Sequence, residues 1–245
     1  MIVDSHTVVG FWPREAKDLS PQALLRLMQR HGVDRACVTS ARAFVYDFVE
    51  GNQETLEICA AHEALLPGTV IDPRRFLECR DEIASARDRG FRLFRLFPDE
   101  QGWTADSPAF TRLLPDFAEA GLPVAAPSRI GLGPLLRAWG DVDLPLILSG
   151  VTYWDLADVL AMMEAHPRVC LDTSLLNSPG AIELICERFG AERVLFGSGA
   201  LLNEMAPALE TVRQAQVSEA QRALILGGNA TRLFGVSRKG RRAAP

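Results

Sequence analysis

The chain has 245 residues and a formal net charge of −5 at pH 7. This length is enough for one α/β domain with a full core, and the mildly acidic balance argues against a protein that binds nucleic acid or an anionic membrane. No apolar run resembles a signal peptide or is long enough to span a bilayer.

Five cysteines are present, none of them in a CxxC pair, and several lie in apolar segments. An odd number of such thiols is typical of buried, reduced side chains rather than of a disulfide framework. We therefore expect a cytoplasmic protein.

Short apolar segments alternate with helical patterns along the whole chain. The segments are almost continuously apolar, as strands buried on both faces must be, and they predict strands at residues 2–4, 35–39, 68–71, 91–96, 123–126, 144–148, 169–172 and 193–196. Serine–proline pairs at residues 20–21, 107–108 and 178–179 predict helix starts. Gly32, Gly90, Gly121 and Gly190 predict helix ends.

Eight strand–helix units without a linker predict an α/β fold, a single (β/α)8 TIM barrel that occupies residues 1–236. An open, doubly wound sheet is the alternative, which the number of strands and the absence of a phosphate-loop motif disfavour. Residues 218–233 predict extra C-terminal helices that close the bottom or side of the barrel: Ser218 and Gln221 form a capping box, and Gly228-Asn229 is expected to break the segment into two helices. The basic segment 237–245 predicts a disordered tail.

The active groups of such barrels lie at the C-terminal ends of the strands. The polar residues expected there are Asp4, His6, Thr39, Ser40, Asp72, Arg74, Arg95, Arg129, Ser149, Asp172, Thr173, Ser174 and Ser198. Residues two apart on a strand share a face, so Asp4, His6 and Val8 are expected to point the same way.

Several segments resemble motifs of a known family, in the family's own order. Residues 3–10 (Val-Asp-Ser-His-Thr-Val-Val-Gly) resemble its first-strand Asp-x-His-x-His motif, and residues 71–74 (Ile-Asp-Pro-Arg) resemble "vDPr". Residues 90–98, 122–124, 169–174, 193–199 and 228–233 resemble "GfkGiKlhp", "lPv", "vylDtS", "RvlfGtD" and "GNAarL". On these segments the chain resembles the amidohydrolase-2 family of metal-dependent hydrolases, which implies the same barrel.

The resemblance also implies a site for a divalent metal, commonly zinc, whose bound water is the nucleophile. Family members hold the metal with two first-strand histidines, histidines after strands five and six, and an aspartate after strand eight. Here only the first position keeps its ligand, at His6, whereas Val8, Pro127, Gly150 and Gly199 stand at the others. A catalytic zinc needs three protein ligands and an open position, so we expect no zinc or other divalent metal.

His6, Arg95 and Asp172 are the candidate catalytic residues. His6 is either a general base or a structural histidine that is hydrogen-bonded to Asp4 or a neighbouring strand. An arginine in a barrel mouth must be paired, because an unpaired buried charge is costly. The partner of Arg95 is therefore Asp72, Asp172, or the carboxylate or phosphate of a ligand.

Five further residues are candidate ligand-binding groups. Arg129 can join Arg95 in an anion clamp, and Ser149 and Ser198 offer hydroxyls. Tyr153 and Trp154, with other loop aromatics, either line an apolar pocket, form a protein interface, or fill the mouth. A serine hydrolase is not expected, because no Gly-x-Ser-x-Gly segment occurs.

Two classes of function remain open. The preferred one is a non-catalytic homologue that has lost the metal centre, acting as partner or subunit of an active amidohydrolase or as a ligand-binding barrel. The alternative is a metal-independent hydrolase or lyase, decarboxylase-like, that acts on a small carboxylate with His6 as base and Arg95 as anion clamp. The expected partners are a second copy of the chain, as implied by the family, or an intact homologue, and a small anionic ligand.

Overall fold

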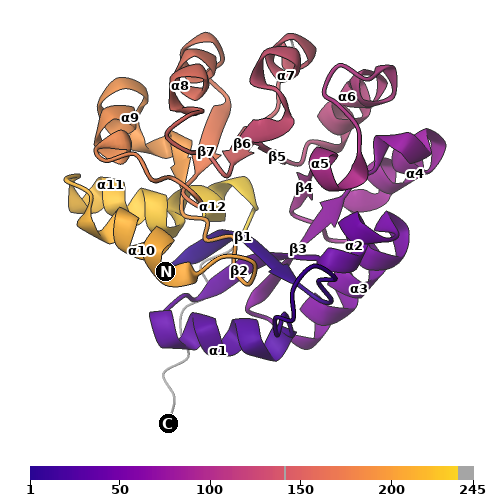
Figure 1. The fold of residues 1–245 in the computed structure, drawn as a ribbon, viewed down its shortest axis with the longest axis horizontal. Helices are drawn as coiled ribbons and strands as arrows, with labels where there is room; N and C mark the ends of the chain where they lie inside the picture. The colour runs from indigo at the N-terminus through magenta and orange to yellow at the C-terminus, as the bar shows by residue number, and fades with distance from the viewer. Residues whose placement is uncertain (141, 237–245) are drawn as a thin grey trace.

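The computed structural model describes residues 1–140 and 142–236, so the predicted basic tail lies outside the described residues. Eight parallel strands follow one another around the barrel in chain order (Figure 1). They are β1 (Val3–Val9), β2 (Arg35–Ser40), β3 (Leu65–Val70), β4 (Leu93–Arg95), β5 (Val124–Pro127), β6 (Leu146–Ser149), β7 (Val169–Asp172) and β8 (Val194–Leu195). The predicted (β/α)8 barrel is confirmed, and the open, doubly wound sheet is excluded.

Helices surround the strands and cover their outer faces (Figure 1). They are α1 (Pro21–His31), α2 (Ala41–Val45), α3 (Phe48–Ala61), α4 (Phe76–Ala86), α5 (Pro98–Gln101), α6 (Pro108–Ala120), α7 (Leu132–Trp139), α8 (Leu156–Ala165), α9 (Ala181–Phe189), α10 (Met205–Gln214), α11 (Glu219–Ala223) and α12 (Asn229–Leu233). Within the described ranges none of them is long and apolar enough to cross a membrane.

Two of the three predicted helix starts are confirmed. The hydroxyls of Ser20 and Ser107 accept hydrogen bonds from the backbone of the first turns of α1 and α6. The third start is wrong: α9 begins only after Gly180, whose φ is +75°, and the Ser178 hydroxyl is buried without a partner in the described part of the chain.

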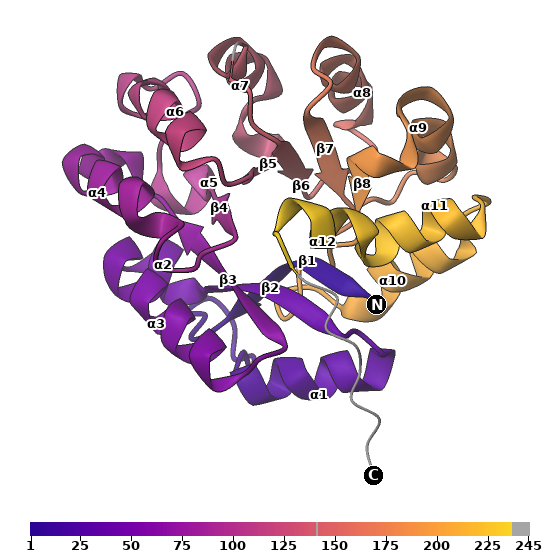
Figure 2. The ribbon, with the colours of Figure 1, turned by 180° about the vertical axis from the view of Figure 1, so that it is seen from behind.

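The C-terminal helices lie beside β1 and β8 and close one end of the barrel, as Figure 2 shows. The predicted break at Gly228-Asn229 is wrong, because both residues are right-handed helical and a π-helical turn, Leu224–Gly228, joins α11 to α12. Gly227 allows the π-helical turn to pack closely against the N-terminal backbone, because a β-carbon at this position would lie 2.4 Å from the Met1 carbonyl oxygen. At this end the barrel interior is filled by a layer of side chains, one from each strand: Val3, Cys37, Leu66, Leu93, Ala125, Ile147, Cys170 and Leu195. Ala230 and Phe234 of the C-terminal segment pack beneath this layer.

The barrel closes between β1 and the segment that follows β8. Because β8 has only two residues, backbone bonds beyond it complete the closure: the Ser5 amide donates to the Phe196 carbonyl at 2.9 Å and the Gly199 amide to the His6 carbonyl at 2.8 Å. The carboxylate of Asp4 adds to this seam by accepting hydrogen bonds from both the amide and the hydroxyl of Ser198.

Helix α2 is held at the mouth of the barrel by a close approach to α3. A β-carbon on Gly51 would lie 2.1 Å from the Ala43 nitrogen, which is backbone and cannot swing away. The approach fixes Phe44, whose ring stacks on Phe97 at 3.9 Å between centroids. The position of one wall of the mouth therefore depends on a residue without a side chain.

Substitution of Gly51 tests this packing. We expect Gly51→Ala to lower the free energy of unfolding by about 2 kcal/mol or more, because the added methyl overpacks a backbone contact. The control Gly133→Ala adds a methyl to α7 with only the tip of Arg137 nearby, at 3.6 Å, and is expected to be neutral or stabilising by up to about 1 kcal/mol. Urea denaturation measures both, and equal stability of the two variants would contradict the packing argument.

Candidate functional site

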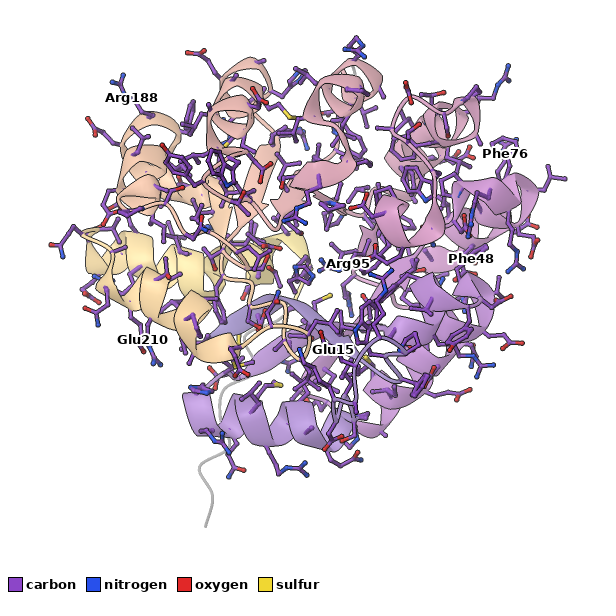
Figure 3. The ribbon with its side chains drawn as sticks, in the orientation of Figure 1. Glu15, Phe48, Phe76, Arg95, Arg188 and Glu210 are labelled. Atoms are coloured by element: carbon purple, nitrogen blue, oxygen red, sulfur yellow. The ribbon has the colours of Figure 1, made fainter. Side chains whose placement is uncertain are left out.

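A cavity of about 210 Å³ lies at the C-terminal ends of β1, β4, β5 and β6. Its polar walls include His6, Arg95 and Ser149, and its apolar walls include Phe97 and Leu175. Figure 3 shows Arg95 near the middle of the ring of strands. The chain thus brings four of the predicted site residues, His6, Arg95, Arg129 and Ser149, to one cavity at the expected end of the barrel.

His6 and Asp172 form a pair across the mouth. The His6 Nδ1 lies 3.1 Å from Oδ2 of Asp172, whose Oδ1 accepts hydrogen bonds from the amide and hydroxyl of Ser174 at 3.0 and 2.5 Å. Burial opposes ionisation of Asp172, but His6, the Ser174 hydroxyl and the charge of Arg95 together lower its pKa. Asp172 is therefore an anion that orients the imidazole.

His6 itself is neutral near pH 7. Burial and the positive charge of Arg95 lower its pKa, and Asp172 opposes them only in part. With Asp172 as its acceptor, the proton of neutral His6 is assigned to Nδ1. The lone pair of Nε2 is then left as an acceptor in a side chain that lines the cavity.

Arg95 is buried without an ion pair among the described residues. It is 3% exposed, its Nη2 donates to the Ser5 carbonyl at 2.7 Å, and its Nε has no hydrogen-bond partner in the described ranges. Burial lowers its pKa against the charges of Cys37, Asp172 and Asp4. Of the two carboxylates expected as its partner, Asp72 pairs instead with Arg74 at 2.7 Å. Asp172 acts on Arg95 through its charge, but within residues 1–140 and 142–236 Arg95 forms no ion pair.

Ser149 presents a second open hydrogen-bonding group to the same cavity. Its side chain is 4% exposed, and its Oγ is buried without a partner among the described residues. Buried polar groups are nearly always satisfied. An open Nε on Arg95 and an open Oγ on Ser149 in the wall of one cavity therefore indicate a place for an oxygen-bearing ligand.

Arg129 also lines this cavity, at its exposed rim. Burial raises the pKa of the neighbouring Asp155, but hydrogen bonds from Thr152 and Ser128 and the charge of Arg129 lower it. The aromatic residues predicted for the site lie outside the cavity. Tyr153 and Trp154 are 64% and 86% exposed, contact each other edge to face, and do not line the cavity.

Ser198 and Asp4 face away from the mouth. The register of β1 against β2 shifts between Asp4, which pairs with Ala36, and Val8, which pairs with Thr39. Partners on parallel strands share a face and residues three apart do not, so the expectation that Asp4 points with Val8 is wrong. Asp4 is instead buried against Ser198, whose hydroxyl and amide it binds, and neither residue lines the cavity.

Some loop aromatics pack on one another near the mouth. Phe44 and Trp103 are buried, Trp12 packs on Phe44 at 5.9 Å between centroids, and Phe44 stacks on Phe97. Of these rings only Phe97 lines the cavity, whereas Tyr153 and Trp154 remain in contact with solvent.

Two acidic residues of the cavity were not anticipated. Asp99 and Glu100 begin α5, directly after β4, and both line the outer part of the cavity. The pair Asp-Glu immediately after a proline at the end of a predicted strand was the available signal. The sequence could not predict that the Ser5 carbonyl accepts a hydrogen bond from Arg95, because every residue type has a backbone carbonyl.

The residues of the mouth do not fit a divalent metal. The part of the chain that the structure describes contains no group of three or more His, Cys, Asp or Glu residues placed to hold one. The two nearest donors, His6 and Asp172, bind each other, and the cation of Arg95 lines the same cavity. At two of the family's ligand positions the cavity wall is Pro127 and Gly150, which offer no imidazole.

Comparison with known proteins gives a family match and a fold match. A family model described as Amidohydrolase matches residues 11–236. A search of curated protein sequences finds no match. The chain is similar to 5-carboxyvanillate decarboxylase from Sphingomonas paucimobilis, at a TM-score of 0.80 and 15% identity over 96% of this chain and 99% of that one.

Two other solved structures are similar over nearly their whole length. A dihydroxybenzoic acid decarboxylase from a Polaromonas species, with bound manganese and the inhibitor 2-nitroresorcinol, gives a TM-score of 0.79 and 14% identity over 96% of each chain. A probable 2-pyrone-4,6-dicarboxylic acid hydrolase from Acinetobacter baumannii, with citric acid bound, gives 0.73 and 16% identity over 96% of this chain and 99% of that one. At these identities the likeness shows the fold alone.

The buried carboxyl group of Asp4 predicts a pH dependence of stability. Burial raises its pKa to about 7, against hydrogen bonds from Ser198 and His6. Since the folded pKa exceeds the unfolded value, the stabilisation is present at low pH and lost as pH rises through 7. Between pH 5 and pH 8 we expect the wild type to lose about 2 kcal/mol of unfolding free energy relative to Asp4→Asn.

Chemical denaturation at the two pH values measures this difference. Asp18→Asn is the control: hydrogen bonds from Ser20 lower the pKa of that exposed carboxyl group, so its effect on stability should be the same at pH 5 and pH 8. A difference between wild type and Asp4→Asn that does not change with pH would show that Asp4 stays ionised in the seam.

Proposed function

Since this chain belongs to the amidohydrolase family, we propose that the mouth of its barrel binds a small carboxylate on Arg95 without a metal ion. The observation that carries the proposal is the buried guanidinium of Arg95, which has an open Nε and no ion pair within the described ranges. An unpaired buried charge is costly, and a carboxylate is the planar anion that matches a guanidinium through two parallel hydrogen bonds.

The neighbouring groups define the rest of the ligand. The hydroxyl of Ser149 has no hydrogen-bond partner among the described residues and lines the same cavity. The unprotonated Nε2 of neutral His6 can accept a hydrogen bond from a donor group of the ligand. A carboxylate with a nearby hydroxyl satisfies Arg95 and His6 together. A further solved structure similar to this chain, at a TM-score of 0.77 and 14% identity, is a 2,6-dihydroxybenzoate decarboxylase in complex with 2,6-dihydroxybenzoate, which supplies a probe of this kind. The unpaired cysteines fit the cytoplasmic setting we propose.

A metal-independent lyase or hydrolase is the second candidate, and the His6–Asp172 pair favours it. An anionic aspartate that holds neutral histidine in one tautomer is the arrangement of a general base. In this candidate Arg95 holds the substrate carboxylate and Nε2 of His6 takes the proton of its hydroxyl. Without turnover, the chain is a carboxylate-binding barrel, on its own or as subunit of an active homologue, with the exposed Tyr153 and Trp154 as the contact surface proposed for that partner.

Binding is tested by calorimetry with benzoate and 2,6-dihydroxybenzoate in the presence of a chelator. We expect Arg95→Gln to weaken both ligands about tenfold or more, because a charge-assisted hydrogen bond is lost. The control Arg80→Gln removes an exposed arginine of α4 that pairs with Asp116 outside the barrel, and should leave affinity unchanged. Binding that survives Arg95→Gln, or that requires added metal, would contradict the proposal.

Turnover separates the two candidates. If the His6–Asp172 pair acts as a base, conversion of 2,6-dihydroxybenzoate persists with a chelator and declines as pH falls through the lowered pKa of His6, where the imidazole is protonated. His6→Gln and Asp172→Asn should then abolish turnover while benzoate still binds. A wild-type chain that binds both acids and converts neither is a binding barrel.

A further inference from the structure

The cavity at the mouth carries opposite charges at its two ends. Arg95 supplies a cation from the buried wall, and Asp99 and Glu100 supply two carboxylates from exposed positions on α5. Neither acidic side chain forms a hydrogen bond or ion pair in the part of the chain that the structure describes. The cavity is therefore dipolar rather than uniformly basic.

One basic residue, Arg129, lines the same cavity and forms no ion pair among the described residues. Its charge helps to lower the pKa of Asp155, which burial raises, and the two rim carboxylates outnumber it. Glu100 also borders a second hollow that contains Arg74 and Arg75, but Arg74 is paired with Asp72, and Arg75 contacts Asp47 and Glu78. The two rim carboxylates are thus left to interact with a ligand.

The wall between the two charged ends is apolar. Phe97, Ala126 and Leu175 line it, so the middle of a bound molecule lies against carbon. A ligand that matches the cavity from end to end has an anion, an apolar spacer and a cation in this order. A second carboxylate at the outer end would face the two carboxylates of Asp99 and Glu100 against the single guanidinium of Arg129, and its binding would be disfavoured.

We propose that the ligand of this mouth is a zwitterion, an amino acid whose carboxylate binds Arg95 and whose ammonium group reaches Asp99 and Glu100 across an apolar spacer. The inference rests on the proposed function for its carboxylate end, and it adds the outer subsite. Asp99 and Glu100 are specificity residues in this assignment. They select the ammonium group and take no part in holding the carboxylate.

The test uses three series of straight-chain probes: monocarboxylic acids, their ω-amino derivatives and dicarboxylic acids of the same chain length. Calorimetry at pH 7.5 and low salt measures each affinity. At the length that spans the cavity, the ω-amino acid is expected to bind about threefold to fivefold more tightly than the plain acid, the range of exposed ion pairs. The diacid is expected to bind more weakly than either, and 0.5 M salt should reduce the preference.

Variants assign the effect to the rim. The double variant Asp99→Asn/Glu100→Gln should bind the plain acid as the wild type does and lose the preference for the ω-amino acid. The control Asp88→Asn/Glu119→Gln removes two exposed acidic residues beside the hollow between α4 and α6 and should keep the preference. This control changes the net charge by the same amount as Asp99→Asn/Glu100→Gln, and its two positions do not line the cavity at the mouth.

The outcomes distinguish this inference from the proposed function. If plain acids bind through Arg95 while ω-amino acids bind no better, or diacids bind best, the zwitterion assignment is overturned and the proposed function stands. A preference that persists in Asp99→Asn/Glu100→Gln also overturns it. If no carboxylate of any series binds, both fail.

Discussion

The first strand fixes the site by making three different contacts with three consecutive residues. Asp4 turns toward Ser198 and holds the seam of the barrel, the Ser5 carbonyl accepts from Arg95, and the imidazole of His6 reaches Asp172. This division is possible because the register of β1 against β2 shifts between Asp4 and Thr7. A bulge redirects side chains at the rim of a barrel. Here the carboxylate of Asp4 binds Ser198 in the seam, and the imidazole of His6 lines the cavity.

The charge of Arg95 acts on both members of the neighbouring pair. Burial and this charge lower the pKa of His6, and Arg95 adds to His6 and the Ser174 hydroxyl in lowering the pKa of Asp172 against burial. A cation in the wall of the cavity also disfavours a divalent metal beside it. In the motif that residues 90–98 resemble, Arg95 stands at the place of a lysine. A guanidinium can orient a carboxylate through hydrogen bonds, but it does not lower the pKa of a bound water toward 7 as zinc does.

Much of the fold follows from local patterns, whereas the site depends on pairing between distant segments. The run Val169–Asp172 was predicted as a strand with the bounds it has, and Ser20 and Ser107 cap the helices they were expected to cap. The direction of Asp4 was missed because the shift in register comes from neighbours at both edges of β1. The continuous helix at Gly228 was missed because the neighbouring glycine, Gly227, serves a close contact with the Met1 backbone, which is far away in the sequence.

The energetics of burial connect these features to function. A guanidinium that is 3% exposed, with an open Nε, lacks the ion pair that would offset its loss of hydration, and removing such a partner from a buried pair typically costs about 3–5 kcal/mol. The single strong bond to Ser5 and the nearby charge of Asp172 recover only a part. A core built for stability alone would place an apolar side chain at the end of β4. In the function proposed above, an anion that enters the cavity offsets this cost, which is the energetic reason for placing an arginine there.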